Sequence, residues 1–193
     1  PEVLRPLTLS DGRILRCDLS AAPTDDCLMH DPTKEHRVFK IRNRAGESGI
    51  LAAFHISAES TPVKGFALPE DCGLPVGSYA WYEYFTRAAG ILPAGGRVEI
   101  ELAGNDDFRL YTFVPMPAGG VAVLGRTDLF IGVSAACRSG DTVVLAEEGG
   151  RVGLVSAAPV RVMTLAGAPV PVNRRGVLTE IIPPKGETVL RLQ

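Results

Sequence analysis

Histidine, methionine and tryptophan are scarce in this chain of 193 residues, which has three, three and one of them. It also has no excess charge of one sign, because 20 Lys and Arg stand against 22 Asp and Glu. Without a basic excess, no nucleic-acid partner is expected. Apolar runs such as 121–124 and 152–155 are only as long as a strand, far from the ~18 residues of a spanning helix, so no membrane partner is expected.

Cysteine is also sparse. Cys17, Cys27, Cys72 and Cys137 contain no C-x-x-C pair. In a chain of this size such sparse cysteines predict buried free thiols rather than a disulfide framework, and a cytoplasmic location is favoured. Because ligand-spaced partners and glycine-rich phosphate fingerprints are missing, we expect neither a metal nor a cofactor. The start at Pro1, without Met or an apolar signal core, predicts a piece of a longer protein or a processed chain.

Glycine and proline, by contrast, are abundant, with 21 and 15 residues spread over the whole chain. Between them lie short segments rich in Val, Ile, Leu, Tyr and Phe, a pattern typical of many short strands. The sequence therefore predicts an all-β fold, an antiparallel β-sandwich. We expect its strands at residues 13–17, 37–43, 49–57, 79–86, 97–102, 108–114, 121–124, 142–146, 151–156, 160–165, 177–181 and 188–192.

Alternation and turn residues support this prediction. In 97–102, RVEIEL, apolar side chains fall on one face and charged ones on the other, as in a half-buried strand. The segments 94–96, 148–150 and 175–176 each contain one or two glycines, which predicts hairpin turns there. The best candidate helix, 127–136, is interrupted by Gly132 and fits a strand equally well.

The composition shifts at 31–36, a polar segment with Pro32. We place a boundary there, with residues 1–32 as strand plus loop and residues 33–193 as the sandwich.

No catalytic constellation stands out. A serine hydrolase needs an activated Ser, a His and a carboxylate in mutual reach, and a G-x-S-x-G elbow is missing. His55 lies inside an expected strand and is interpreted as structural, whereas His30 and His36 flank the boundary loop and are expected to be solvated. A Cys27–His30 pair is left open, although the two need not face each other.

Three adjacent pairs of acids deserve comparison, because neighbours in a strand point to opposite faces. The pairs 106–107 and 147–148 lie at turns, where solvated charge is expected. Asp25 and Asp26 lie where a loop meets an apolar segment, and are the pair kept as a candidate. The densest aromatic run, 79–85, contains Trp81, for which core packing is the first interpretation and a carbohydrate platform the second.

Several ordered motifs resemble the raffinose synthases and seed-imbibition α-galactosidases of glycoside hydrolase family thirty-six. Residues 11–16 (DGRILR) and 23–28 (PTDDCL) are similar to the family's "DGSILR" and "PTRDCLF", and "DP" follows at 31–32. Residues 39–43 (FKIRN) and 49–54 (GILAAF) are similar to "LKIWN" and "GVIGAFN". Weaker similarities follow at 111–116 and 121–125. Asp25, Met29 and Arg42 depart from the family's Arg, Phe and Trp.

The resemblance implies a (β/α)₈ barrel followed by a C-terminal β-sandwich, with residues 1–32 as a remnant of the last barrel strand and its loop. The family's nucleophile and acid/base are aspartates on earlier barrel strands, so the resemblance assigns no catalytic residue to this chain. It implies a parent that is a retaining α-galactosidase-like glycosidase or a galactosyltransferase.

Because active sites face the C-terminal ends of barrel strands, the resemblance puts Arg16, Asp25 and Asp26 near the rim as substrate-binding candidates. The expected function is a non-catalytic accessory domain that supports the upstream (β/α)₈ barrel, with galactosides or other carbohydrates as ligands. The alternative is a stand-alone carbohydrate-binding module, using Trp81, or a structural interaction module. As a barrel remnant, the N-terminal piece is expected to be poorly ordered or docked on the sandwich or on another copy of the chain, and to add little to the main core. Pairing of residues 13–17 into the sandwich would instead favour a self-contained structural domain.

Overall fold

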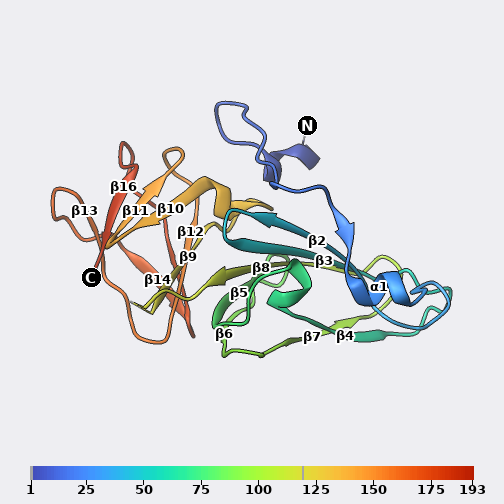
Figure 1. Cartoon of the computed structure of the whole chain (residues 1–193). Helices are drawn as coiled ribbons and strands as arrows, with labels where there is room; N and C mark the ends of the chain where they lie inside the picture. The colour runs from blue at the N-terminus through green and yellow to red at the C-terminus, as the bar shows by residue number, and fades with distance from the viewer. Residues whose placement is uncertain (1, 119) are drawn as a thin grey trace.

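The computed structural model describes residues 2–118 and 120–193, and strands make up most of the ordered elements (Figure 1). The predicted all-β antiparallel architecture is confirmed. The strands are β1 (Ala22–Pro23), β2 (Phe39–Ala45), β3 (Ser48–Phe54), β4 (Val63–Ala67), β5 (Tyr79–Glu83), β6 (Ala89–Leu92), β7 (Val98–Leu102), β8 (Phe108–Pro115), β9 (Val121–Arg126), β10 (Ala136–Ser139), β11 (Thr142–Leu145), β12 (Val152–Ser156), β13 (Val162–Thr164), β14 (Val172–Arg175), β15 (Leu178–Ile181) and β16 (Val189–Leu192). The helices are the 3₁₀ turns η1 (Glu2–Leu7), η2 (Pro69–Cys72) and η3 (Gly132–Ala135), and one short α-helix, α1 (Asp25–Met29).

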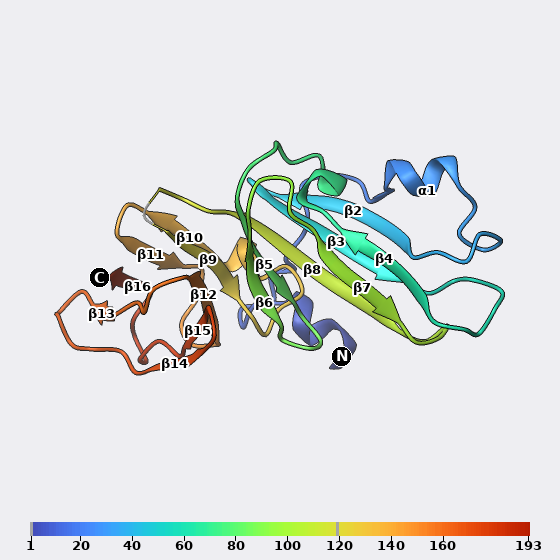
Figure 2. The same cartoon turned by 90° about the horizontal axis from the view of Figure 1, so that it is seen from below.

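The first part of the chain forms two layers. A six-stranded sheet in the order β1-β2-β3-β8-β5-β6 faces a two-stranded ribbon, β4-β7, and all strand pairs are antiparallel. Figure 2 shows the ribbon lying along the sheet. Leu51 and Phe113 from the sheet and Val63 and Leu102 from the ribbon are fully buried between the two layers.

Alternation decides which side chains enter this core. In β7, Ile100 and Leu102 are buried while Glu99 and Glu101 face solvent, as the sequence predicts. Lys64 stands opposite Glu101 across the ribbon, and its Nζ lies 3.2 Å from the carboxylate. The ribbon therefore has one apolar and one charged face.

The last part of the chain forms a second pair of sheets, with orders β14-β15-β12-β9 and β10-β11-β16-β13. Their facing side chains make a separate apolar core that includes Val143, Val152, Leu154 and Leu190, all fully buried. Residues 33–193 thus contain two layered pairs rather than one. In Figure 1 the second pair lies at the opposite end of the molecule from α1.

A third cluster joins the two pairs. Ala80 and Tyr82 of β5 pack against Leu124 of β9, Val155 of β12 and Leu178 of β15. Because β9 follows β8 after a short connection and enters the second pair directly, the chain crosses from one pair to the other at this contact.

Leu7, Leu15 and Cys17 of the N-terminal segment (residues 1–32) pack on the side of the first sheet that faces away from the ribbon. The predicted strand at 13–17 is wrong, because residues 7–15 fold back on themselves and leave only an isolated bridge between Thr8 and Ile14. Leu9 is buried against Leu129 and Ala135, while Ile14 stays 54% exposed. Among the side chains that the structure describes, those of residues 4–32 do not take part in the two large cores. The boundary after residue 32 stays a prediction.

The segment 127–136 is neither a regular helix nor a strand. It consists of turns and η3, and a Cβ on Gly132 would overlap the carbonyl oxygen of Arg126. This close approach between η3 and the end of β9 requires glycine. A membrane span would need a longer and more apolar helix than any in the described residues.

All four cysteines are free, as predicted, but only Cys27 and Cys72 are buried, so the expectation of burial is wrong for Cys17 and Cys137. The Sγ of Cys72 lies 3.5 Å from the carbonyl oxygen of Ile50, and burial raises the pKa of this thiol to about 12. Burial also raises the pKa of Cys17.

We expect a single fast-reacting thiol when the native protein is titrated with a chromogenic disulfide at pH 8. Cys137 is exposed, whereas Cys72 holds its proton at this pH, and the thiolate is the reactive form. Cys137→Ser should remove the fast phase, and denaturant should expose all remaining thiols. Any fast-reacting thiol that remains in the native Cys137→Ser variant would contradict the burial described here.

Candidate functional site

The candidate residue Asp26 takes part in a buried cluster around Lys40. The side chain of Lys40 in β2 is 6% exposed, and its Nζ lies 2.8 Å from Asp71 Oδ2, 3.2 Å from Asp26 Oδ2 and 3.2 Å from the carbonyl oxygen of Phe66. An ammonium has three protons to donate, so these three oxygens satisfy it. Thr24 Oγ1 in turn donates to Asp26 Oδ1 at 2.6 Å.

Lys40 and Asp26 stabilise each other's charged forms, whereas for Asp71 burial outweighs the hydrogen bond and charge of Lys40 and raises the pKa of that carboxyl. Desolvation lowers the pKa of Lys40, but the hydrogen bond and charge of Asp71, helped by Asp26, outweigh it and raise that pKa above its usual value. Burial raises the pKa of Asp26, but Thr24 and Lys40 more than offset this and hold that pKa low. Lys40 is therefore a charged structural group, and not a neutral amine that could act as a nucleophile.

Asp25 and Asp26 begin the helical turn α1, and their side chains contact different partners. Asp25 Oδ1 lies 3.0 Å from Arg42 Nη2, and its side chain is 81% exposed. Asp25 and Arg42 are two of the positions that depart from the raffinose synthase pattern. The residues that replace the family's Arg and Trp at these positions therefore contact each other. Arg16 is exposed and forms no hydrogen bond or ion pair with any residue in the described part of the chain. The structure thus does not bring Arg16 into contact with Asp25 or Asp26.

Trp81 is half-buried and packs on the core of the first sheet pair. Its ring centroid lies 6.5 Å from that of Tyr111, and a Cβ on Gly90 of the neighbouring strand would overlap the indole. This arrangement fits the packing interpretation. A sugar-binding role for Trp81 stays a prediction.

One serine, one histidine and one carboxylate do lie together. His36 Nδ1 is 3.3 Å from Ser57 Oγ and 3.7 Å from Glu59 Oε2, and His36 Nε2 is 3.0 Å from the carbonyl oxygen of Pro62. A triad needs the serine and the acid on opposite ring nitrogens. Here both approach the same nitrogen, so the group cannot relay a proton from serine to acid.

The other histidines also have structural surroundings. His55 is 2% exposed, and its Nε2 lies 2.8 Å from the carbonyl oxygen of Thr61. His30 Nδ1 lies 2.9 Å from Glu35 Oε2, whereas the thiol of Cys27 accepts a hydrogen bond from Lys40 N at 3.3 Å. A Cys27–His30 pair is therefore not formed.

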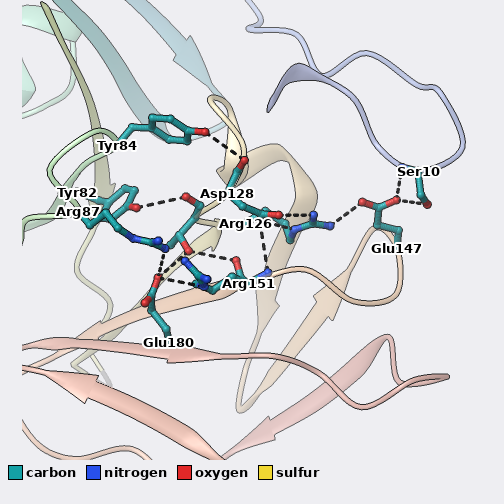
Figure 3. A network of polar contacts seen from close by, with 10 residues as sticks. Ser10, Tyr82, Tyr84, Arg87, Arg126, Asp128, Glu147, Arg151 and Glu180 are labelled. Carbon is teal, nitrogen blue, oxygen red and sulfur yellow. Dashed lines mark hydrogen bonds and ion pairs between the residues drawn. The ribbon is translucent and has the colours of Figure 1, made fainter. Parts of the chain in front are cut away.

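The densest polar network lies elsewhere, and Figure 3 shows its first half around Arg126 at the end of β9. The guanidinium forms a bidentate pair with Asp128, with both distances 2.7 Å, and Nη1 donates to Glu147 Oε1 at 2.6 Å. The other oxygen of Glu147 accepts hydrogen bonds from the backbone and hydroxyl of Ser10 at 2.6 and 2.5 Å. This series of contacts ties the N-terminal segment to the second pair of sheets.

The second half of the network centres on Glu180 of β15 (Figure 3). Its Oε1 accepts hydrogen bonds from Arg87 Nη2 at 2.8 Å and from Thr127 Oγ1 at 2.9 Å, and Arg151 Nε lies 4.0 Å away. The hydroxyl of Tyr82 donates to the carbonyl oxygen of Thr127 at 3.3 Å, and burial raises the pKa of Tyr82 to about 12. These contacts connect the first sheet to the second pair.

Glu147→Gln should lower stability by about 1–3 kcal/mol at pH 7, the usual worth of hydrogen bonds to a charged group. Although burial raises the pKa of Glu147, the hydrogen bonds from Ser10 and Arg126 hold it below the usual value. A depressed pKa adds stability above the unfolded value, and this stability is lost as the pH falls through the folded value. The stability difference from the unmodified protein should therefore shrink from pH 7 to pH 3 in urea unfolding. A difference that stays constant with pH would contradict the ionic role of Glu147.

Sequence reasoning missed the residues that matter most in these clusters. Glu147 was interpreted as a solvated turn residue, and this is wrong, because its side chain is only 12% exposed. Nothing in the sequence singles out Lys40 or Glu180 as buried, since each looks like an ordinary charged residue in a strand. No group of three or more His, Cys, Asp or Glu in residues 2–118 and 120–193 is arranged to hold a metal ion.

The fold and these clusters define an all-β protein of layered antiparallel sheets with structural ion pairs. Its N-terminal part is related to known proteins: residues 1–61 match the family described as raffinose synthase or seed imbibition protein Sip1. The resemblance seen in the motifs is therefore confirmed for this part of the chain.

Similar proteins include galactinol–sucrose galactosyltransferase of Oryza sativa subsp. japonica, which is 47% identical over 55 residues. Probable galactinol–sucrose galactosyltransferase 6 of Arabidopsis thaliana is 42% identical over 55 residues. Each match covers 28% of this chain and 7% of the relative. Among solved structures, a GH27 β-L-arabinopyranosidase from Geobacillus stearothermophilus aligns with a TM-score of 0.38 and 15% identity, over 53% of this chain and 21% of that one.

Proposed function

We propose that this chain is a non-catalytic accessory domain that supports the (β/α)₈ catalytic barrel of an α-galactosidase-like or galactosyl-transferring enzyme. The observation that carries the proposal is the match over residues 1–61, because it runs without a break from the N-terminal segment into the first sheet. The relatives that match this region are named as galactosyltransferases. In this proposal residues 1–32 belong to the end of the barrel and the sheets follow it.

The contacts of the N-terminal segment support such a connecting role. β1 pairs with β2, and Asp26 of α1 shares Lys40 with Asp71 of η2. Ser10 is bound by Glu147 in the second pair of sheets. The segment is therefore held at both pairs of sheets, so that a barrel attached to it would be held in a defined orientation.

The acids of the described residues also favour a non-catalytic role. A retaining glycosidase needs one carboxylate that is free to attack the sugar and a second as acid/base, about 5–5.5 Å apart. Asp26 and Asp71 do meet, but both are bound to the same ammonium. In this proposal the catalytic aspartates belong to earlier barrel strands, as the resemblance implies, and no acid among the described side chains is assigned their role.

A direct test is turnover by the purified chain. We expect no release of nitrophenol from a nitrophenyl α-galactoside, either as hydrolysis or with sucrose as acceptor. A rate that survives repurification, and that is abolished in an Asp26→Asn or Asp71→Asn variant, would overturn the proposal.

A second test examines the proposed partner. The reading frame that precedes the codon of Pro1 should encode a (β/α)₈ pattern, about 250 residues or more of alternating strands and helices. In the protein made from that whole frame, Phe113→Ala should lower the temperature at which α-galactoside turnover is lost, without changing KM. A preceding frame with no such pattern would contradict the accessory role.

A further inference from the structure

A groove of about 470 Å³ lies on the second pair of sheets, beside the turn between β5 and β6. Four of its lining residues are charged: Arg87 from the turn, Arg151 before β12, Arg175 of β14 and Glu180 of β15. Its volume falls within the range of small-molecule sites.

The strand register places the polar side chains of the groove on one face. Asn173 is opposite Glu180, and Arg175 lies two residues further along the same strand, so both share the face of Glu180. Gly153 is the partner of Glu180 on the other side, and Arg151 lies two residues before it. The space beside Gly153 is filled by Thr127 and Leu124, and Arg87 reaches this face from the first sheet (Figure 3).

The groove has an uncompensated positive charge. Three arginines and one glutamate give +3 − 1 = +2. Glu180 is 9% exposed in its side chain and is paired with Arg87 and, more distantly, with Arg151. Arg175 is exposed, and its guanidinium forms no hydrogen bond or ion pair with any residue in 2–118 or 120–193.

The neighbouring Arg174 shows what a structural arginine looks like in the same strand. Its guanidinium donates to the carbonyl oxygens of Ser156, Ala157 and Ala158 at 3.1, 3.0 and 2.7 Å. Arg174 is therefore saturated by the protein, whereas Arg175 has its donors available to a ligand.

The backbone of Arg87 is a second, independent observation. Its φ is +60°, and every other residue with positive φ in the described chain is glycine. A left-handed backbone costs a side-chain-bearing residue energy that glycine avoids, and such strain concentrates at functional sites. This turn has an arginine where glycine would adopt the same backbone conformation with less strain, and the side chain of Arg87 lines the groove.

We propose that this groove binds a small ligand that carries a phosphate or carboxylate group. The guanidinium fork matches both oxyanions and forms charge-assisted hydrogen bonds with them. Val172 and Ile182, which are 45% and 66% exposed, form an apolar wall for the body of the ligand, and Asn173 adds a polar contact. This inference does not depend on the proposed accessory role.

The test is calorimetric titration of the intact chain at low salt with glucose 6-phosphate, glucuronate and glucose. We expect one or both anions to bind, no binding of neutral glucose, and weaker binding as salt is added. The anion that binds more tightly shows whether the groove recognises phosphate or carboxylate. Arg175→Gln should weaken binding about tenfold or more, which corresponds to the loss of about 1.4 kcal/mol. Since Arg175 has no contact to lose, this variant should keep the thermal stability of the unmodified protein.

Arg161→Gln is the matched control, because Arg161 is exposed and is not among the residues that line the groove. It should bind the anions as the unmodified chain does. The proposal is overturned if neither anion binds at about 10 mM, a generous limit for a specific site. It is also overturned if glucose binds as tightly as its phosphate, or if Arg175→Gln and Arg161→Gln bind equally well.

Discussion

Lys40→Met is expected to lower the free energy of unfolding by about 3–5 kcal/mol, the usual cost of removing one partner from a buried group of charges. The side chain of Lys40 is 6% exposed and that of Asp71 is 14% exposed. Methionine fills a similar volume, but it leaves the carboxylates of Asp71 and Asp26 facing each other without a cation. Urea unfolding followed by circular dichroism measures the loss.

Lys64→Met is the matched control for this prediction. Lys64 pairs with Glu101 at 3.2 Å, but its side chain is 73% exposed, so its loss should cost less than about 1 kcal/mol. The double variant Lys40→Met with Asp71→Asn should recover part of the stability, because one of the two orphaned charges is removed. Equal losses for Lys40→Met and Lys64→Met would show that the Lys40 cluster is not buried as described.

Phe113→Ala is expected to cost about 3–5 kcal/mol, the usual range for deleting a buried aromatic ring. Phe113 is fully buried at the centre of the first core, and its ring stacks on Tyr111 with centroids 6.4 Å apart. The surrounding β-sheet can collapse only partly into the space left behind, so most of the packing energy is lost. Chemical denaturation at pH 7 gives the difference directly.

The same strand supplies the control for this change. Phe108 is five residues earlier in β8 and therefore on the opposite face, where its side chain is 44% exposed. Phe108→Ala removes contacts with the rings of Phe85 and Phe54, and should cost about 1 kcal/mol. A larger loss of stability for Phe108→Ala than for Phe113→Ala would contradict the assignment of the core to the face of the sheet that carries Phe113.

Much of the strand pattern could be predicted from the sequence because alternation is a local property. The segment RVEIEL becomes β7, with its apolar face inward. The glycines at 95, 149, 150 and 176 take the positive φ that the predicted turns require. The prediction at 13–17 failed, because the backbone there pairs only within its own loop, through the bridge between Thr8 and Ile14, and never joins a sheet. The sequence missed the short strands β1, β4, β6, β10 and β14, since each has at most five residues and too few of them to show an alternating pattern.

The sequence by itself determined the all-β class, most strands, the free thiols and the relation of the N-terminal part to the raffinose synthases. Each of these depends on neighbouring residues or on a linear motif. Only the tertiary structure decided that the strands divide into two layered pairs, because the order of strands in a sheet depends on pairing between distant segments. It also decided which charges are buried. Lys40 meets Asp71 from 31 residues away and Arg87 meets Glu180 from 93 residues away, and no local pattern encodes such partners.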